Sequence, residues 1–292
     1  LVKQGYYVFY SRDYQSLIRG GHNFNVLTFS EKPVNSNDSE IDIIVSLDKK
    51  TTQIHSKQLK KSGIILDGEE ENMYFAGRLF KIFCIDFKVL DDELKELGKR
   101  YDENIKEAKQ GYDSEEKKMC ELKTLKKSDK SFINGSQGIA EGALNSGLEI
   151  YYAYPMTPAT PVLMELGMAQ LDKSNKHKVI ELENEIAVAN AGVGSCMAGK
   201  KTMVGTSGGG FDLMTETLSL CGMAEIPLVF YLSQRPGPAT GVATYTAQGD
   251  LKLALNGGHG EFPRVVLAPG DALESQELIN QGFYFSHKFK IP

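Results

Sequence analysis

The stretch Lys201-Thr-Met-Val-Gly-Thr-Ser-Gly-Gly-Gly-Phe-Asp-Leu-Met-Thr-Glu-Thr-Leu-Ser-Leu-Cys-Gly222 decides the fold class of this chain. Its first part, Lys201 to Thr206, predicts a strand. Residues Ser207 to Gly210 predict a glycine turn, because glycine readily adopts the positive φ that tight connections need. A helix is predicted from Asp212 to Gly222. A strand, a short turn and a helix in this order are the repeating unit of a parallel α/β sheet.

The same alternation extends in both directions from this stretch, across residues 131–292. Small residues dominate there, and predicted helices and strands follow one another regularly, which favours a doubly wound parallel sheet. The predicted helices are Asn134 to Ser146, Pro158 to Leu171 and Glu185 to Ala198. The predicted strands are Glu149 to Ala153, Val179 to Leu182, Pro227 to Leu232 and Arg264 to Leu267.

The N-terminal part predicts a second α/β layer. The predicted strands are Gly5 to Tyr10, Asn25 to Ser30, Ile41 to Leu47 and Ile64 to Leu66. A short helix over Ser56 to Lys61 and a helical pattern over Asp91 to Lys109 accompany them, so we expect parallel strands here too.

A highly charged stretch separates the two layers. Residues 114–130 read as a solvated helix or a linker, and the domain boundary is placed within them. We therefore expect an α/β chain with two doubly wound parallel-sheet domains, residues 1–125 and 131–292.

Composition excludes several functional classes. The chain has 292 residues, is 41% hydrophobic and 24% charged, and carries a formal charge of −5. Such a balance gives no field that recruits nucleic acid or an anionic membrane, and no apolar window is long enough to span a bilayer. Four cysteines, scattered and without C-x-x-C spacing, argue against a metal or iron–sulfur site in this chain and fit a reducing cytoplasm. The chain begins at Leu1 and ends in an apolar stretch, so we expect a fragment.

Four features fall where predicted strands end. They are Thr157 between two prolines, Glu185 at the start of a helix, the turn Ser207 to Gly210, and Arg235. Each has an ordinary structural explanation, such as a surface arginine or a helix-terminal carboxylate. However, the carboxyl ends of parallel strands meet at one sheet edge, where ligands bind in open α/β folds. Their convergence therefore predicts a site, in which Arg235 could hold a carboxylate through two hydrogen bonds.

Five motifs carry a resemblance to a known family. The alpha subunits of 2-oxoacid:ferredoxin oxidoreductases resemble this chain from about Phe132 to Pro292, with the motifs in the same order. They are Tyr154-Pro-Met-Thr-Pro-Ala-Thr160, Glu183-Asn-Glu-Ile-Ala187, Thr206-Ser-Gly-Gly-Gly-Phe-Asp-Leu-Met214, Gln234-Arg-Pro-Gly-Pro-Ala-Thr-Gly241 and Gln248-Gly-Asp-Leu251.

The N-terminal part is similar to the gamma domain of the same family. The similarity lies in Tyr14 to Asn23, in the strand that contains Asp42, and in Asn104 to Gly111. A fused gamma–alpha subunit is thus the interpretation of the whole chain, with both of its ends truncated.

The resemblance implies a pyrimidine-binding domain for thiamine diphosphate and assigns roles to residues. Glu185 matches the catalytic carboxylate that hydrogen-bonds the aminopyrimidine ring and so promotes proton removal from the thiazolium carbon. Thr157 and Arg235 match catalytic and substrate-binding residues, and Arg235 would pair with the carboxylate of a 2-oxoacid. Thr244 matches a second substrate-binding threonine. The implied cofactor-binding residues are Tyr154, Pro155, Glu185, Ser207, Gly208 and Gly209.

The implied activity is oxidative decarboxylation of a 2-oxoacid, such as pyruvate or 2-oxoglutarate, with coenzyme A. The implied products are acyl-CoA, CO₂ and reduced ferredoxin or flavodoxin. The resemblance places Mg²⁺, the diphosphate site and a [4Fe-4S] cluster on a beta subunit, so this chain alone would be inactive. Met156, Ala243 to Tyr245 and Pro236 depart from the family pattern in the substrate loop. Two alternatives stay open, another thiamine-dependent pyrimidine domain and a non-catalytic paralogue that acts as an assembly or binding module.

Overall fold

The computed structural model describes residues 1–15, 20–125, 131–245 and 247–292. It divides into two compact units, one formed by Leu1–Tyr14 and Gly21–Phe132, the other mainly by Ile133–Pro292. Residues 16–19 of the Tyr14 to Asn23 motif and residues 126–130 of the charged stretch lie outside the described residues.

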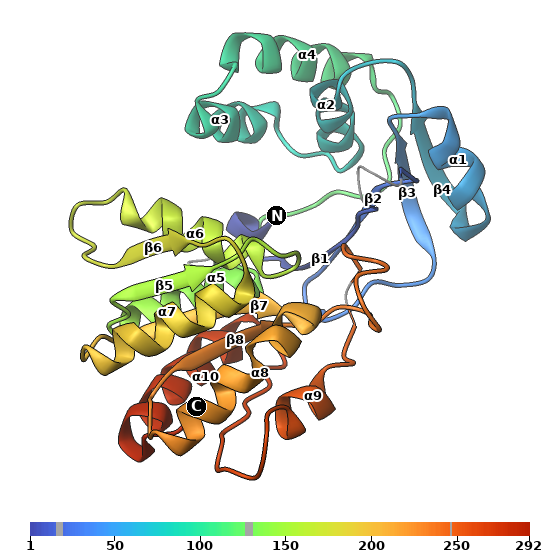
Figure 1. Cartoon of the computed structure of the whole chain (residues 1–292). Coiled ribbons are helices and arrows are strands. Elements are labelled where there is room, and N and C mark those ends of the chain that lie inside the picture. The colour runs from blue at the N-terminus through green and yellow to red at the C-terminus, as the bar shows by residue number, and fades with distance from the viewer. Residues whose placement is uncertain (16–19, 126–130, 246) are drawn as a thin grey trace. The chain divides into compact units, whose positions relative to one another are not determined.

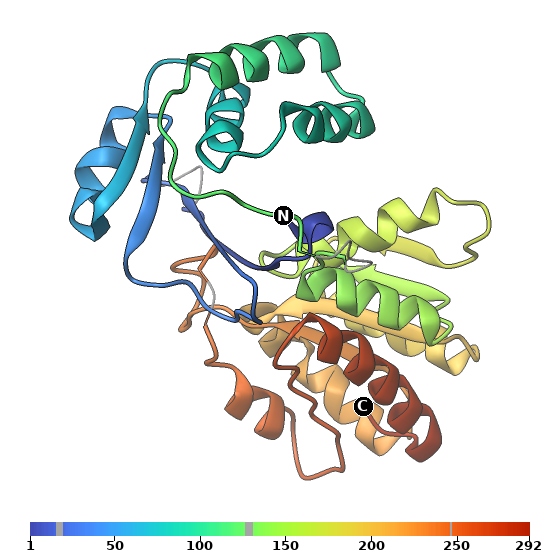
Figure 2. The same ribbon diagram turned by 180° about the vertical axis from the view of Figure 1, so that it is seen from behind.

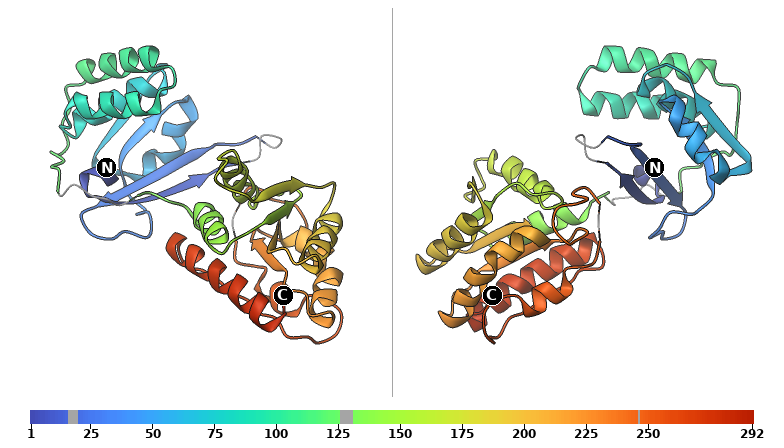
Figure 3. Two further views of the ribbon diagram at one scale, coloured as in Figure 1. Left: turned by 90° about the vertical axis from the view of Figure 1, so that its left-hand side faces the viewer. Right: turned by 45° about the vertical axis from the view of Figure 1, so that its right-hand side comes forward.

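The first unit contains two small sheets and a group of helices (Figure 1). Strands β1 (Tyr7–Asp13) and β2 (Phe24–Ser30) form one sheet, and β3 (Ile41–Ser46) and β4 (Leu59–Asp67) form the other. Figure 3 shows its three longer helices gathered together, and contacts join each of them to the other two. The helical elements are η1 (Val2–Gln4), α1 (Lys49–His55), η2 (Ser56–Gln58), α2 (Asn72–Ile82), α3 (Phe87–Leu97) and α4 (Tyr101–Ser114).

The expectation of parallel strands is only half right in this unit. β3 and β4 are parallel, as predicted, but β1 and β2 form an antiparallel ribbon in which Tyr7 lies opposite Ser30. No helix separates β1 from β2 in the described residues, so a direct antiparallel return replaces the crossover that a parallel pair requires.

Several predicted helix boundaries in the first unit are wrong. The helix expected at Ser56 to Lys61 is helical only over η2 and begins earlier, with α1, because the Asp48 carboxylate accepts hydrogen bonds from the first-turn N–H groups of Lys50 and Thr51. Its last three residues belong to β4. The single helical pattern of Asp91 to Lys109 is two helices, because Gly98 adopts the left-handed conformation and ends α3. Residues 115–125 of the charged stretch have no regular structure, which excludes a helix there.

The second unit is a four-stranded parallel sheet with helices on both faces, as the sequence predicts. The strand order is β6-β5-β7-β8, and every pair is parallel. Its strands are β5 (Ile150–Ala153), β6 (Lys178–Glu181), β7 (Thr202–Ser207) and β8 (Val229–Ser233). Its helices are α5 (Gly135–Asn145), α6 (Thr160–Gln170), α7 (Glu185–Met197), α8 (Gly208–Met223), α9 (Leu251–Asn256) and α10 (Ala272–Phe289).

Each face of this sheet has its own core. On one face α5, α6 and α10 pack around Tyr151 and Met203 (Figure 2). On the other face α7 and α8 pack around Val204 and Leu228. Burial of each such side chain contributes about 1.5–3 kcal/mol, so the two layers fix the position of β7 between them.

Two predictions for the second unit are corrected. Arg264 to Leu267 is not a strand, because it runs as an irregular segment beside the chain end, where the Val265 N–H donates to the Pro292 carbonyl. The glycine turn Ser207 to Gly210 is also not a loop. Gly208 to Gly210 form the first turn of α8, and none of the three has a positive φ.

Candidate active site at the carboxyl edge of the sheet

The residues that follow the strands of the second unit converge, as predicted. Glu185 follows β6, Thr157 follows β5, and Ser207 ends β7, where α8 begins. Arg235 lies just after β8. All four positions lie at the carboxyl edge of the parallel sheet, because the four strands run in one direction (Figure 1).

Glu185 is the buried member of three neighbouring carboxylates. Glu181 and Glu183 are exposed, whereas Glu185 is only 3% exposed. Asn184 caps α7 by accepting a hydrogen bond from the Ala187 N–H, which fixes Glu185 as the first residue of the helix. Its Oε1 atom is buried and has no hydrogen-bond partner among the described residues. Such an atom costs free energy unless a ligand satisfies it.

The glycines of α8 bring this carboxylate close to the helix. A Cβ atom on Gly210 would lie 2.8 Å from Oε1 of Glu185 and 2.1 Å from Oγ1 of Thr206. A Cβ atom on Gly208 would lie 2.8 Å from both carboxylate oxygens of Asp250. These glycines are therefore needed because side chains from other segments approach them closely. The sequence pattern had predicted a different reason, a turn with positive φ.

Arg235 joins two loops of the site. Although it follows a strand at the surface edge, it is 4% exposed. Its Nη1 donates to the Thr157 carbonyl at 2.8 Å, and its Nη2 donates to Thr240 Oγ1 at 2.9 Å and lies 3.3 Å from Met156 Sδ. Its Nε atom is buried, and no residue that the structure describes is hydrogen-bonded to it. Its low exposure and these hydrogen bonds exclude the interpretation of Arg235 as an ordinary surface arginine.

The other predicted site residues occupy the rim. Tyr154 and Pro155 are exposed in the loop after β5. Thr244 is half-buried in the loop after β8, and the side chain of this loop that accepts a hydrogen bond from Arg235 is Thr240.

Sequence reasoning assigned no role to Thr240 or Asp250. Thr240 lies in the motif Gln234 to Gly241 and Asp250 in the motif Gln248 to Leu251. Their place in these motifs was the one feature of the sequence that could have pointed to them. The Asp250 N–H donates a hydrogen bond to Gln234 Oε1. This bond joins the two ends of the loop that carries Arg235 and Thr240.

The charges of the site have no ion-pair partners. Among the described residues, neither Glu185 nor Arg235 takes part in a salt bridge. Ser207 is fully buried, and its Oγ atom also lacks a hydrogen-bond partner. Buried charges are normally paired, so this arrangement suits a ligand with a hydrogen-bond donor for Glu185 and an anionic group for Arg235.

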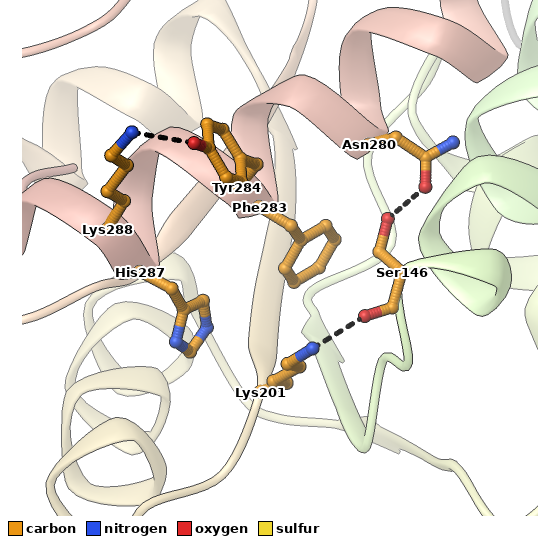
Figure 4. Close-up of a pocket in the computed structure, with 7 residues that line it drawn as sticks. All are labelled: Ser146, Lys201, Asn280, Phe283, Tyr284, His287 and Lys288. Atoms are coloured by element: carbon orange, nitrogen blue, oxygen red, sulfur yellow. Dashed lines mark hydrogen bonds between the residues drawn. The ribbon is translucent and has the colours of Figure 1, made fainter.

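A cavity of about 480 Å³ lies elsewhere in the second unit (Figure 4). It is lined by Lys201, which immediately precedes β7, by Ser146 after α5, and by side chains of α10. In Figure 4 Lys201 donates to the Ser146 carbonyl, while His287 projects from α10 into the same region. Burial lowers the pKa of His287, and nearby lysines lower it further. Lys201 precedes β7 and Ser146 precedes β5. The cavity therefore lies at the amino edge of the sheet, opposite the carboxyl edge that carries Glu185.

Two kinds of feature are absent from the described residues. No group of three or more His, Cys, Asp or Glu side chains is placed to hold a metal ion. No helix among these residues has both the length and the apolar character needed to cross a bilayer.

Comparison with known proteins identifies relatives over both units. Residues 141–292 match the family described as pyruvate flavodoxin/ferredoxin oxidoreductase, thiamine diphosphate-binding, and residues 1–105 match the family described as pyruvate ferredoxin/flavodoxin oxidoreductase. The 2-oxoacid:ferredoxin oxidoreductase subunit alpha of a Sulfolobus species is 28% identical over an alignment of 376 residues, which covers 100% of this chain and 60% of the relative.

Two further relatives agree. The 2-oxoglutarate synthase subunit KorA of Archaeoglobus fulgidus is 37% identical over 160 residues, 55% of this chain and 46% of that protein. A solved structure of 2-oxoglutarate:ferredoxin oxidoreductase from Magnetococcus marinus, with 2-oxoglutarate, coenzyme A and succinyl-CoA bound, is similar with a TM-score of 0.87 and 25% identity. That match covers 99% of this chain and 58% of the other.

The chain thus spans about half to three-fifths of the length of these relatives. The second unit has the parallel α/β architecture and the buried edge residues expected from its sequence motifs. With more than half of its residues matched, the chain belongs to the family of thiamine diphosphate-binding pyruvate flavodoxin/ferredoxin oxidoreductase domains.

Proposed function

We propose that this chain is part of a thiamine diphosphate-dependent 2-oxoacid:ferredoxin oxidoreductase. The reaction is oxidative decarboxylation of a 2-oxoacid with coenzyme A, and ferredoxin or flavodoxin accepts the electrons. Residues 131–292 act as the pyrimidine-binding domain and residues 1–125 as the gamma-like domain. The observation that carries the proposal is the buried, unpartnered Glu185 Oε1 at the same sheet edge as the buried Arg235.

The residues of the site fit the pyrimidine half of thiamine diphosphate. An aminopyrimidine ring with a protonated nitrogen would supply the donor that Glu185 Oε1 lacks. Gly209 leaves the space beside it without a side chain, Gly208 lets the Asp250 carboxylate approach the start of α8, and the exposed Tyr154 and Pro155 offer apolar surface at the rim. When bound, thiamine diphosphate supplies the carbon nucleophile for the keto group and accepts the electrons released with CO₂.

Glu185 has a defined task in this proposal, which is to hold a proton between its Oε1 atom and the ring nitrogen. Burial makes this hydrogen bond strong, because water does not compete for it. The first turn of α8 limits the movement of the carboxylate, since Gly210 leaves only the space of a hydrogen atom beside it.

Arg235 and the substrate loops provide the second task, which is binding of the 2-oxoacid. The guanidinium pairs with the carboxylate, and Thr157 and Thr244 line the approach from the loops after β5 and β8. The hydrogen bond from Nη1 to the Thr157 carbonyl positions the guanidinium relative to the loop after β5. An arginine held in this way can present a planar fork of donors, which fixes the orientation of the carboxylate.

A partner subunit completes the site in our proposal. Three large apolar side chains near the edge are about half exposed, namely Ile186, Leu213 and Leu251. Their exposure beside the buried charges supports coverage by another chain. We assign the diphosphate, Mg²⁺ and [4Fe-4S] sites to that beta subunit. The four unpaired cysteines support the reducing cytoplasm as the location.

Reduction of a viologen dye by the full-length protein with its co-purified partner tests this proposal. The assay contains thiamine diphosphate, Mg²⁺, coenzyme A and a series of 2-oxoacids. We expect turnover that requires both the 2-oxoacid and coenzyme A. Glu185→Gln should abolish it without preventing assembly, because the amide cannot exchange the proton. An intact complex that holds cofactor and cluster but has no turnover would favour a binding or assembly module. Full activity of Glu185→Gln would reject the assigned role of Glu185.

A further inference from the structure

The side-chain partners of Arg235 carry one further inference, which rests on its proposed role as the carboxylate-binding residue. A guanidinium can bind a carboxylate through two parallel hydrogen bonds along either of two edges. One edge uses Nε and Nη2, and the other uses Nη1 and Nη2. Nη2 is therefore required for every bidentate arrangement.

In the structure this shared nitrogen is already occupied. Nη2 donates to the Thr240 hydroxyl at 2.9 Å, and its other neighbour is the thioether of Met156 at 3.3 Å. A thioether sulfur is a weak acceptor, whereas a hydroxyl oxygen is a good one. Both N–H groups of Nη2 are thus occupied, and Thr240 is the stronger of the two acceptors with which a ligand carboxylate competes there. Nε, in contrast, is buried and has no partner.

The surroundings of Thr240 allow its hydroxyl to separate from Nη2. Arg235 is buried, but Thr240 is exposed, so the hydroxyl can be solvated after it separates from Nη2. A Cβ atom on Gly209 would still be 3.9 Å from Nη2 and 4.0 Å from Thr240 Oγ1. The absence of a side chain at Gly209 therefore leaves this position beside the guanidinium and the Thr240 hydroxyl open.

We propose that Thr240 is a placeholder for the substrate carboxylate and thereby sets the affinity for 2-oxoacids. Its hydroxyl satisfies Nη2 in the free protein and is displaced when a carboxylate binds Nε and Nη2 together. This competition lowers the affinity for every 2-oxoacid by a similar factor, because all of them share the carboxylate next to the keto group. Thr244 remains the residue assigned to substrate contact.

Equilibrium binding of oxamate, a non-reactive analogue of a 2-oxoacid, tests the proposal on the full-length protein with its partner subunit. Thr240→Val keeps the shape of the side chain and removes the competing acceptor. We expect the Kd of oxamate to fall by about tenfold, the order of one hydrogen bond to a charged group. Thr240→Ser keeps the hydroxyl and should bind oxamate with the wild-type Kd.

Steady-state kinetics supply a second readout. For Thr240→Val we expect KM to fall by a similar factor for a short aliphatic 2-oxoacid and for a dicarboxylic one. An unchanged or higher Kd for oxamate would overturn the proposal, since the hydroxyl would then be neutral or a direct ligand of the carboxylate. Changes in KM that differ strongly between the two substrates would also overturn it. If oxamate binds as expected but the wild type has no turnover, the proposed function fails while the competition at Arg235 stands.

Discussion

Alanine at Gly210 tests the close approach of Glu185 to helix α8. Gly209 and Gly210 are consecutive residues in the first turn of this helix, and neither has a positive φ. The backbone therefore accepts alanine at both positions. Their surroundings differ sharply, because a Cβ atom meets Thr206 Oγ1 at 2.1 Å at position 210 but nothing closer than 3.9 Å at position 209. Gly209→Ala is thus a matched control for Gly210→Ala.

The magnitudes follow from these contacts. Replacement of a helical glycine by alanine stabilises a protein by up to about 1 kcal/mol, and this gain applies to both variants. At position 210 the new methyl group also collides with Thr206 and Glu185, which are both buried and cannot turn away into solvent. Overpacking of this kind costs about 1–3 kcal/mol. The gain from replacing a helical glycine by alanine is the same in both variants and cancels. Gly210→Ala should therefore be less stable than Gly209→Ala by about 1–3 kcal/mol.

Two measurements on the full-length protein with its partner check this difference. Denaturant titration should give the expected difference in the free energy of unfolding. Binding of thiamine diphosphate should weaken in Gly210→Ala relative to the wild type, because the displaced Glu185 no longer reaches the ring nitrogen. Equal stability of the two variants, together with a wild-type affinity of Gly210→Ala for the cofactor, would refute the placement of Glu185 against α8.

Two further predictions concern titratable groups. Burial lowers the pKa of His287 in the folded protein, so the unfolded chain binds this proton more readily. The resulting stability is present above the ordinary histidine pKa of about 6.5 and is lost as the pH falls below it. His287→Gln should lower the slope of unfolding free energy against pH between about pH 7 and 5, and an unchanged slope would contradict this. Burial also raises the pKa of Cys221 to about 12, so a thiol reagent at pH 8 should label the exposed Cys84 of the native protein before Cys221. Equal labelling rates, measured by peptide mass spectrometry, would show that Cys221 is accessible.

Local sequence pattern correctly predicted most of the second unit. The alternation of apolar strands and small-residue helices gives β5 to β8 in the observed chain order, but it also predicts a strand at residues 264–267 that the structure does not contain. It also separates the buried Glu185 from the exposed Glu181 and Glu183, because only the first begins a helix at the end of a strand. Convergence at one edge was predictable as well, since it follows from the parallel direction of the strands.

Pairing between segments was less predictable in the first unit. The strand character of β1 and β2 is local and was recognised, but their antiparallel partnership depends on which edges meet in space. The boundaries of α1 and α3 depend on single residues, Asp48 and Gly98, whose capping roles are visible in sequence only when the helix position is already known.

By itself, then, the sequence determined the α/β class, the parallel sheet of the second unit and the edge where Glu185 and Arg235 meet. Only the tertiary structure decided how these residues are held. The need for glycine at Gly208 and Gly210 arises from carboxylates of other segments. The partners of Arg235 come from the loop after β5 and from Thr240 in its own loop, whose ends are joined by the hydrogen bond from Asp250 to Gln234. The physical reason is that patterns of hydrophobicity act over a few residues, whereas these contacts join atoms from segments far apart in the chain.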